Sequence, residues 1–163
     1  IVSFHDISVG GFIVSAVEMM LAGGCGLNLD LSKISFLKES SSLFSEELGM
    51  LFQINKKDFS EFKKDLVKLG LKNSFFNIGS TNNTNNLFLK TSSQSLRMSH
   101  KVLMHSWSSV SYNIKLLRDN QETTKQEHKF LLNKKRSKLF QNFNFKVKKT
   151  FHRTTPKLSL IHI

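Results

Sequence analysis

The 163-residue sequence predicts an α/β or α+β fold built on one mixed sheet with packed helices. Three observations support this class. Apolar residues recur at helical spacing in some segments and at every second position in others, and the two kinds of segment alternate along the chain. A hydrophobic content of 39% is sufficient to bury a core in a chain of this length. We therefore expect one domain, or one domain with an appendage.

The first half of the chain predicts three strands and two helices. Residues 1–4 have the composition of a strand, and residues 12–21 place their apolar side chains at helical spacing. Gly23–Gly24 ends this helix, as glycine commonly does. Leucines alternate strictly with polar residues over 26–31, which predicts a half-buried strand. A short helix over 41–47 and a largely buried strand over 48–54 complete this half.

The second half predicts longer helices. Asp58 and Glu61 resemble a capping box, and apolar residues at helical spacing follow up to residue 69. A long helix with a single apolar stripe is expected farther along, carrying Leu103, Trp107, Val110, Ile114 and Leu117. The remaining expected elements are strands over 75–78 and 87–89, a loop over 80–86 and a polar helix over 123–132.

The net charge of +12 invites comparison with nucleic-acid-binding proteins, but the composition argues against that class. Arginine is favoured for phosphate and base recognition because its planar guanidinium makes paired hydrogen bonds. Of the 24 basic residues, only Arg97, Arg118, Arg136 and Arg153 are arginines. Nucleic acid is therefore an unlikely partner, and a basic module that binds RNA or an acidic surface is kept as the alternative.

The single cysteine, Cys25, excludes an internal disulfide framework. A reducing compartment, the cytoplasm, fits this composition. The longest apolar stretch, residues 12–22, is interrupted by Ser15 and Glu18. It is shorter than the roughly 20 residues that a membrane-spanning helix needs, so no membrane partner is expected.

The turn from His5 to Gly11 carries the most informative residue pattern. The carboxylate of Asp6 is a ligand type that Mg²⁺ prefers. The hydroxyl of Ser8 and the backbone N–H groups of Gly10 and Gly11, at a helix start, are suited to phosphate oxygens. The pattern therefore predicts a metal–nucleotide site. The alternative from spacing alone is a turn in which Asp6 or Ser8 merely caps the helix.

Three blocks of sequence resemble one family. The first joins His5-Asp6-Ile7-Ser8-x-Gly-Gly to Glu18-Met19-x-x-Ala22-Gly23-x-Cys25-Gly26. The second is Leu43-Phe44-Ser45-Glu46-Glu47-Leu48-Gly49, and the third contains Trp107, Leu117-Arg118-Asp119-Asn120 and Gln126-Glu127-His128. In this order and spacing they resemble the large-type phosphoribosylformylglycinamidine synthases of purine biosynthesis.

The resemblance implies an activity and a fold. The family is a ligase that converts formylglycinamide ribonucleotide to formylglycinamidine ribonucleotide with ATP and glutamine. The implied fold is the C-terminal domain of the aminoimidazole-ribonucleotide-synthetase-like superfamily, with a helical and extended tail. The implied cofactors are Mg²⁺ and ATP (or ADP), with Asp6 as metal ligand and Ser8, Gly10 and Gly11 at the nucleotide.

This chain departs from the family at two informative positions. The family has a second acid where Val9 stands, and a proline is usual where Gln121 stands. Loss of the second acid puts the strength of the metal site in doubt, because one carboxylate leaves the ion dependent on phosphates and water.

The resemblance also implies an organisation. We expect a synthetase C-terminal-like domain over 1–98, a helical extension over 99–132, a basic linker over 133–156 and the truncated first strand of a glutaminase domain over 157–163. Both ends look severed, so a fragment that is inactive alone is expected. Its expected partners are the missing synthetase and glutaminase regions.

Overall fold

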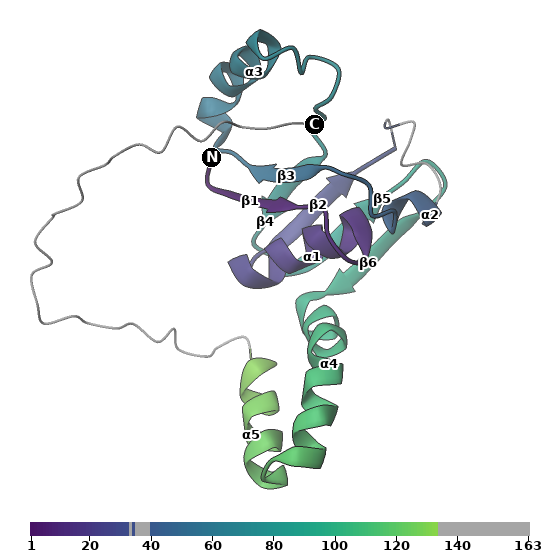
Figure 1. The fold of residues 1–163 in the computed structure, drawn as a ribbon, viewed down its shortest axis with the longest axis vertical. Helices are drawn as coiled ribbons and strands as arrows, with labels where there is room; N and C mark the ends of the chain where they lie inside the picture. Colours follow the sequence, from purple (N-terminus) through teal and green to yellow (C-terminus); the bar gives the residue numbers. More distant parts are fainter. Residues whose placement is uncertain (33, 35–39, 134–163) are drawn as a thin grey trace, which may run out of the picture.

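The computed structural model describes residues 1–32, 34 and 40–133 (Figure 1). In this part of the chain, helix α1 (Gly11–Gly23) lies against a four-stranded sheet (Figure 1). Helices α4 (His100–Arg118) and α5 (Gln121–Leu131) form a hairpin that projects away from this sheet (Figure 1). None of the helices in these residues has the length and apolar character needed to cross a bilayer.

The four-stranded sheet has the order β4-β2-β5-β6. Its strands are β2 (Gly26–Asp30), β4 (Gly79–Asn82), β5 (Asn86–Lys90) and β6 (Ser95–Ser99). The central pair, β2 and β5, is parallel, whereas the two outer pairings are antiparallel. The predicted α/β class with a mixed sheet and packed helices is confirmed.

Helix α1 (Gly11–Gly23) supplies much of the core. Its most deeply buried apolar side chain, Met20, is fully enclosed, and Leu29 and Leu87 of the sheet are buried in the same cluster. Gly24 ends the helix in a left-handed conformation, as the sequence predicts. In strand β2, the leucines face this core and the polar residues face solvent, which confirms the expected half-buried strand.

Strands β1 (Ser3–Asp6) and β3 (Met50–Gln53) pair with each other in a separate antiparallel sheet. The expectation that the third strand is largely buried is wrong, because only Leu51 is buried in β3. The physical reason is that β3 has one strand neighbour in the described residues and presents its other side chains at the surface. Helix α2 (Ser40–Leu43) is shorter than predicted.

The largest errors of sequence-based prediction lie at the two edges of the four-stranded sheet. The expected strand over 75–78 is not a strand, and β4 occupies part of the expected loop over 80–86. Strand β6 was not predicted at all. In both cases the residues are mostly polar and exposed, so the strands are set by backbone pairing with β2 and β5 rather than by apolar periodicity.

The amphipathic helix is confirmed as α3 (Phe59–Lys68), preceded by a short 3-10 turn, η2 (Lys56–Asp58). The capping box is not formed, because the Asp58 side chain makes no capping hydrogen bond. Phe62 packs edge-on against Phe52 of β3, with ring centroids 5.9 Å apart. Helix α3 therefore covers part of the two-stranded sheet.

The two helices of the hairpin are α4 (His100–Arg118) and α5 (Gln121–Leu131). The predicted apolar stripe exists on α4, but only its first residue, Leu103, is buried. Trp107 is 57% exposed and Leu117 is 92% exposed. The stripe therefore leaves the core one turn after Leu103 and continues at the surface.

Helix α5 packs against a different and more polar flank of α4. Ser108 and Thr124 are buried between the helices, and the rings of Tyr112 and His128 stack with centroids 4.0 Å apart. The apolar stripe of α4 stays exposed because α5 contacts the polar flank of α4 instead of the stripe.

The proposed linker and glutaminase strand, over 133–156 and 157–163, lie almost entirely outside the described residues. The family-based division at residue 98 stays a prediction, although α4 begins nearby, at His100.

Candidate functional site

The predicted site residues lie together in the connection from β1 to α1. Asp6 is the last residue of β1 and is paired in register with Met50. Its side chain is 77% exposed, so the carboxylate is open to solvent and to a ligand. Helix α1 begins at Gly11, where the sequence predicts it.

Glycine is required at the turn itself. Gly10 and Gly11 have φ angles of 88° and 73°, in the left-handed region that disfavours other residues. A Cβ on Gly11 would lie 2.5 Å from the backbone carbon of Phe44. The Gly–Gly pair therefore lets the segment from α2 to β3 lie directly on the start of α1.

The backbone N–H groups of the turn already have partners. Gly10 N–H donates to Glu46 Oε1 at 2.9 Å, and Gly11 N–H donates to the carbonyl oxygen of Ser8 at 2.9 Å. Glu46 was not predicted as a site residue, because its partner lies 36 residues away in the sequence. Phosphate oxygens at Gly10 would have to replace this carboxylate.

Buried Ser15 holds the backbone on the other side of the turn. Its hydroxyl accepts a hydrogen bond from Ser8 N–H at 3.2 Å and donates to the carbonyl oxygen of Gly11 at 3.2 Å. The alternative of a helix capped by Asp6 or Ser8 is not observed, because the residue at the N-cap is Gly10 and no side chain caps it. The side chains of Asp6 and Ser8 are therefore not used as caps.

His5 connects Asp6 to residues far away in the sequence. Its Nδ1 contacts the backbone carbonyl oxygen of Asp6 at 2.5 Å and lies 3.4 Å from Asp6 Oδ1. Its Nε2 lies 3.3 Å from Glu18 Oε2. The other carboxylate oxygen of Glu18 accepts a hydrogen bond from Trp107 Nε1 at 3.0 Å. A chain of polar contacts therefore runs from α4 through α1 to the end of β1.

The residues fit a metal ion only partly. Asp6 offers one exposed carboxylate, and within the described residues no group of three or more histidine, cysteine or acidic side chains could hold a metal ion. Val9 is 82% exposed, so it does not fill space in place of the second acid. An ion held at Asp6 would need phosphates and water for its other ligands.

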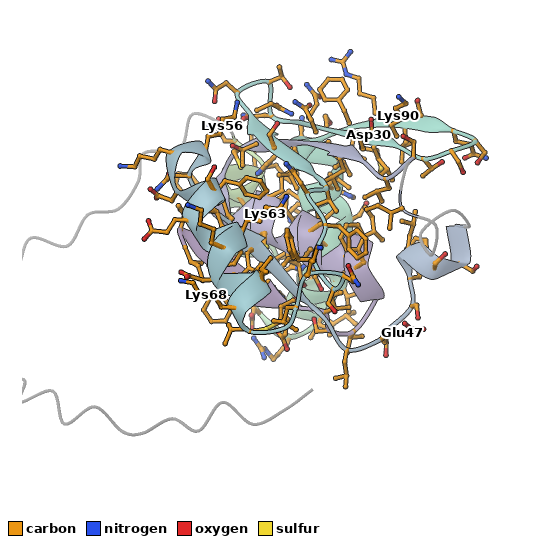
Figure 2. All side chains as sticks on the ribbon, turned by 90° about the horizontal axis from the view of Figure 1, so that it is seen from above. Asp30, Glu47, Lys56, Lys63, Lys68 and Lys90 are labelled. Carbon is orange, nitrogen blue, oxygen red and sulfur yellow. The ribbon has the colours of Figure 1, made fainter. Side chains whose placement is uncertain are left out.

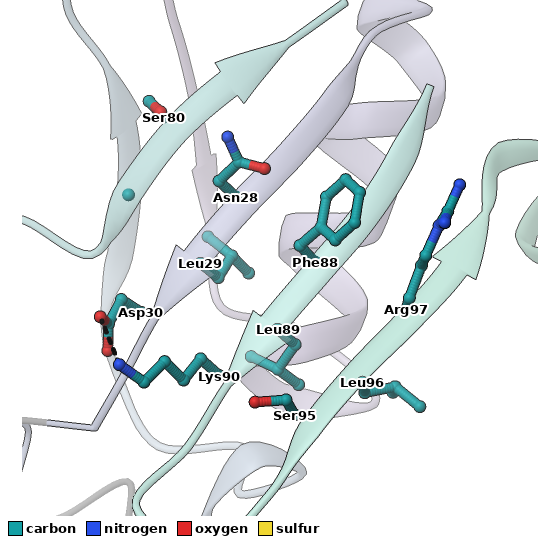
Figure 3. A pocket seen from close by; sticks show the side chains of 11 residues that line it. Asn28, Leu29, Asp30, Ser80, Phe88, Leu89, Lys90, Ser95, Leu96 and Arg97 are labelled. Carbon is teal, nitrogen blue, oxygen red and sulfur yellow. Dashed lines mark ion pairs between the residues drawn. The ribbon is translucent and has the colours of Figure 1, made fainter. Parts of the chain in front are cut away.

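Two surface hollows lie elsewhere, and neither is lined by Asp6, Ser8, Gly10 or Gly11. One hollow lies on the open face of the four-stranded sheet (Figure 3). There Arg97 lies over the Phe88 ring, and Lys90 lies 3.6 Å from Asp30. The other lies along α3. The predicted metal–nucleotide site at Asp6 and Ser8 therefore stays a prediction.

Part of the positive charge is spread over η2 and α3. Lys56, Lys63 and Lys68 project into solvent from these helices (Figure 2). Lys68 is partly neutralised by Asp65, 3.0 Å away. These exposed lysines form a solvated helix face.

Comparison with known proteins shows the family to which the matched residues belong. Residues 1–91 match the family model described as AIR synthase related protein, C-terminal domain. The chain is also similar to the phosphoribosylformylglycinamidine synthase of Saccharomyces cerevisiae, with 31% identity over 132 residues. The match covers 78% of this chain but 10% of the yeast protein, so the chain spans about a tenth of that relative. These matches do not favour a basic binding module.

Proposed function

Because the chain belongs to the family of AIR synthase related proteins, as a C-terminal domain, we propose that it is a segment of a phosphoribosylformylglycinamidine synthase of purine biosynthesis. The proposed reaction converts formylglycinamide ribonucleotide to formylglycinamidine ribonucleotide, with ATP and glutamine as co-substrates. The observation that carries the proposal is the exposed Asp6 carboxylate beside Ser8, at the head of α1, within the matched residues.

The proposed role of this segment is to form one edge of a Mg²⁺–nucleotide site. Asp6 holds the metal ion, and the Ser8 hydroxyl contacts the nucleotide. When bound, ATP supplies the phosphoryl group that activates the amide oxygen for attack by ammonia. The task of this chain is to bind and orient: it presents a hard oxygen ligand at the end of a strand and a polar turn next to it.

Gly10 and Gly11 have a supporting role in this proposal. Their N–H groups are committed to Glu46 and Ser8, so the glycines shape the turn and make room for the segment at Phe44. Direct contact of phosphate with the Gly10 N–H is possible only when Glu46 moves away. Support for this role comes from the left-handed φ angles of both glycines.

The proposed partners are the regions of the synthase that this chain does not contain, namely the rest of the synthetase and the glutaminase. A single carboxylate cannot complete a Mg²⁺ site, so the isolated chain is expected to be inactive. Cytoplasmic location is proposed from the lone, unpaired Cys25.

A chimera tests the proposal. In the yeast synthase, the segment that matches this chain over 132 residues is replaced by the residues of this chain. We expect ammonia-dependent synthesis in the chimera and its loss in the Asp6→Asn version. The isolated chain should show no turnover in the same assay. A folded chimera that is equally active with Asp6→Asn would contradict the role of Asp6.

A further inference from the structure

Three polar contacts connect the helical hairpin to the proposed metal ligand. Trp107 Nε1 donates to Glu18 Oε1 at 3.0 Å, and Glu18 Oε2 lies 3.3 Å from His5 Nε2. His5 Nδ1 in turn contacts the backbone carbonyl oxygen of Asp6 at 2.5 Å and lies 3.4 Å from Asp6 Oδ1. Trp107 and Glu18 are 89 residues apart in the sequence. The contacts therefore depend on how α4 is seated against α1.

We propose that Glu18 and Trp107 are positioning residues for Asp6, acting through the imidazole of His5. This inference rests on the proposed function, because it assigns what holds the metal ligand in place. Neither residue contacts the metal or the nucleotide. Their effect is on the orientation of the His5 ring, and through it on the carboxylate beside it.

Burial explains why this chain of contacts holds one arrangement. The side chains of His5 and Glu18 are 28% and 30% exposed, so both have less conformational freedom than the 77% exposed Asp6. The free carboxylate of a surface aspartate samples several rotamers. The His5 imidazole contacts the backbone carbonyl oxygen of Asp6 at 2.5 Å and lies 3.4 Å from its carboxylate, so it restricts that sampling and favours one orientation of the metal ligand.

Trp107 is the end of this series of polar contacts that is held in place by the core. One turn before it, Leu103 and Met104 are buried in the core and anchor the start of α4. The indole itself is 57% exposed, so its contribution to the core is small. Its N–H group is nevertheless aimed at Glu18, which gives this surface tryptophan a directional role rather than a packing role.

The consequence is that the site extends beyond the matched domain. The family match ends at residue 91, whereas Trp107 lies on the hairpin that follows it. The hairpin would then contribute to metal affinity from outside the domain. Residues that orient a metal ligand typically change metal affinity about 10- to 100-fold when they are removed.

Metal binding to the 163-residue chain tests this inference. Because the ion needs phosphate ligands, Mn²⁺ is titrated in the presence of ADP as a spectroscopic probe in place of Mg²⁺, by electron paramagnetic resonance, with Mg²⁺ as competitor. Glu18→Gln keeps the shape of the side chain and removes its charge, and we expect Mn²⁺ affinity to fall about 10-fold. Trp107→Phe keeps the aromatic ring and removes the N–H group, and we expect a fall of about 3-fold.

Two controls separate positioning from folding. Val110→Ala removes another exposed side chain of α4 and should leave the affinity unchanged. Melting temperatures of all variants should stay close to that of the wild type. The ¹⁵N chemical shifts of the His5 ring, measured without metal, should change in Glu18→Gln and Trp107→Phe but not in Val110→Ala.

The outcomes are distinguishable. Wild-type binding that is lost in Asp6→Asn and weakened in both positioning variants supports the inference. Wild-type binding that is unchanged in Glu18→Gln and Trp107→Phe overturns the inference and leaves the proposed function standing. A wild-type chain that binds no Mn²⁺ in the presence of ADP overturns both.

Discussion

Gly10 donates its backbone N–H to the carboxylate of Glu46, 36 residues later in the chain, at 2.9 Å. The carboxylate lies at the start of α1, where a helix favours negative charge. Glu46 therefore occupies a position that is also suited to a phosphate group. This contact ties the segment after α2 to the turn that carries Asp6 and Ser8.

Replacement of Glu46 by alanine should loosen this turn. The bond is exposed, so we expect the free energy of unfolding to fall by about 1 kcal/mol or less. Urea denaturation measures this difference. Glu47→Ala is the matched control, because the adjacent Glu47 side chain makes no hydrogen bond or ion pair with the described residues and should change stability little. Equal losses in the two variants would contradict a specific role for Glu46.

Substitution of Gly11 separates backbone strain from steric overlap. Gly11 and Gly24 both have left-handed φ angles, 73° and 61°. An added Cβ on Gly11 would overlap the backbone at Phe44, whereas on Gly24 it would meet nothing within 4 Å. We expect Gly24→Ala to cost about 1 kcal/mol and Gly11→Ala about 3 kcal/mol or more. Thermal or urea unfolding of the two variants would refute this if their losses were the same.

Val9→Asp should strengthen the proposed metal site. The side chain of Val9 is 82% exposed beside Asp6 and Ser8, so a carboxylate can replace it without disturbing the core. A second carboxylate near a divalent ion adds both charge and a hard oxygen ligand. We expect Mn²⁺ affinity to rise about 10-fold. The control is Val9→Asn, which adds a polar side chain without charge and should give a smaller gain.

Protonation of His128 should destabilise the hairpin. Burial and the nearby His105 lower the pKa of His128 below its ordinary value of 6.5, and its Nε2 is buried with no hydrogen-bond partner among the described residues. Just below pH 6.5 the unfolded chain therefore binds more protons than the folded chain. The free energy of unfolding should consequently fall as the pH drops through this window.

Urea denaturation at about pH 7.5 and at pH values between about 6.5 and 5 measures this fall in the free energy of unfolding. His128→Gln should show a weaker pH dependence than the wild type, and His105→Gln an intermediate one. Two carboxyl groups contribute little to the pH dependence in this range. The pKa of Asp119 is lowered by its hydrogen bond with Arg118, and that of Asp30 by Ser32, so both groups titrate below their ordinary value of 3.8.

The elements that sequence patterns predicted well are those with a strong apolar period. Helix α1 and strand β2 were predicted close to their observed bounds, because burial of their apolar faces dictates both structure and pattern. Strands β4 and β6 were missed because their residues are polar and their backbone pairing is set by neighbours far away in sequence. Periodicity also could not show that α5 would pack on a polar flank of α4.

The turn that carries the candidate site was predicted in its residues but not in its contacts. The short spacing from Asp6 to Gly11 identified the turn, and the structure places these residues together at the head of α1. The partners of the turn come from Glu46, Glu18 and, through Glu18, Trp107. Such long-range contacts leave no local pattern. Their one signal was that these residues belong to the blocks that resemble the family.

The central claim is that the turn from Asp6 to Gly11 forms one edge of a Mg²⁺–nucleotide site. Isothermal titration of the chain with ADP, with and without Mg²⁺, tests it most directly. We expect ADP binding that requires Mg²⁺ and weakens about 10-fold or more in Asp6→Asn. Binding of ADP that is the same without Mg²⁺ and in Asp6→Asn, or no binding by the folded wild-type chain, would contradict it.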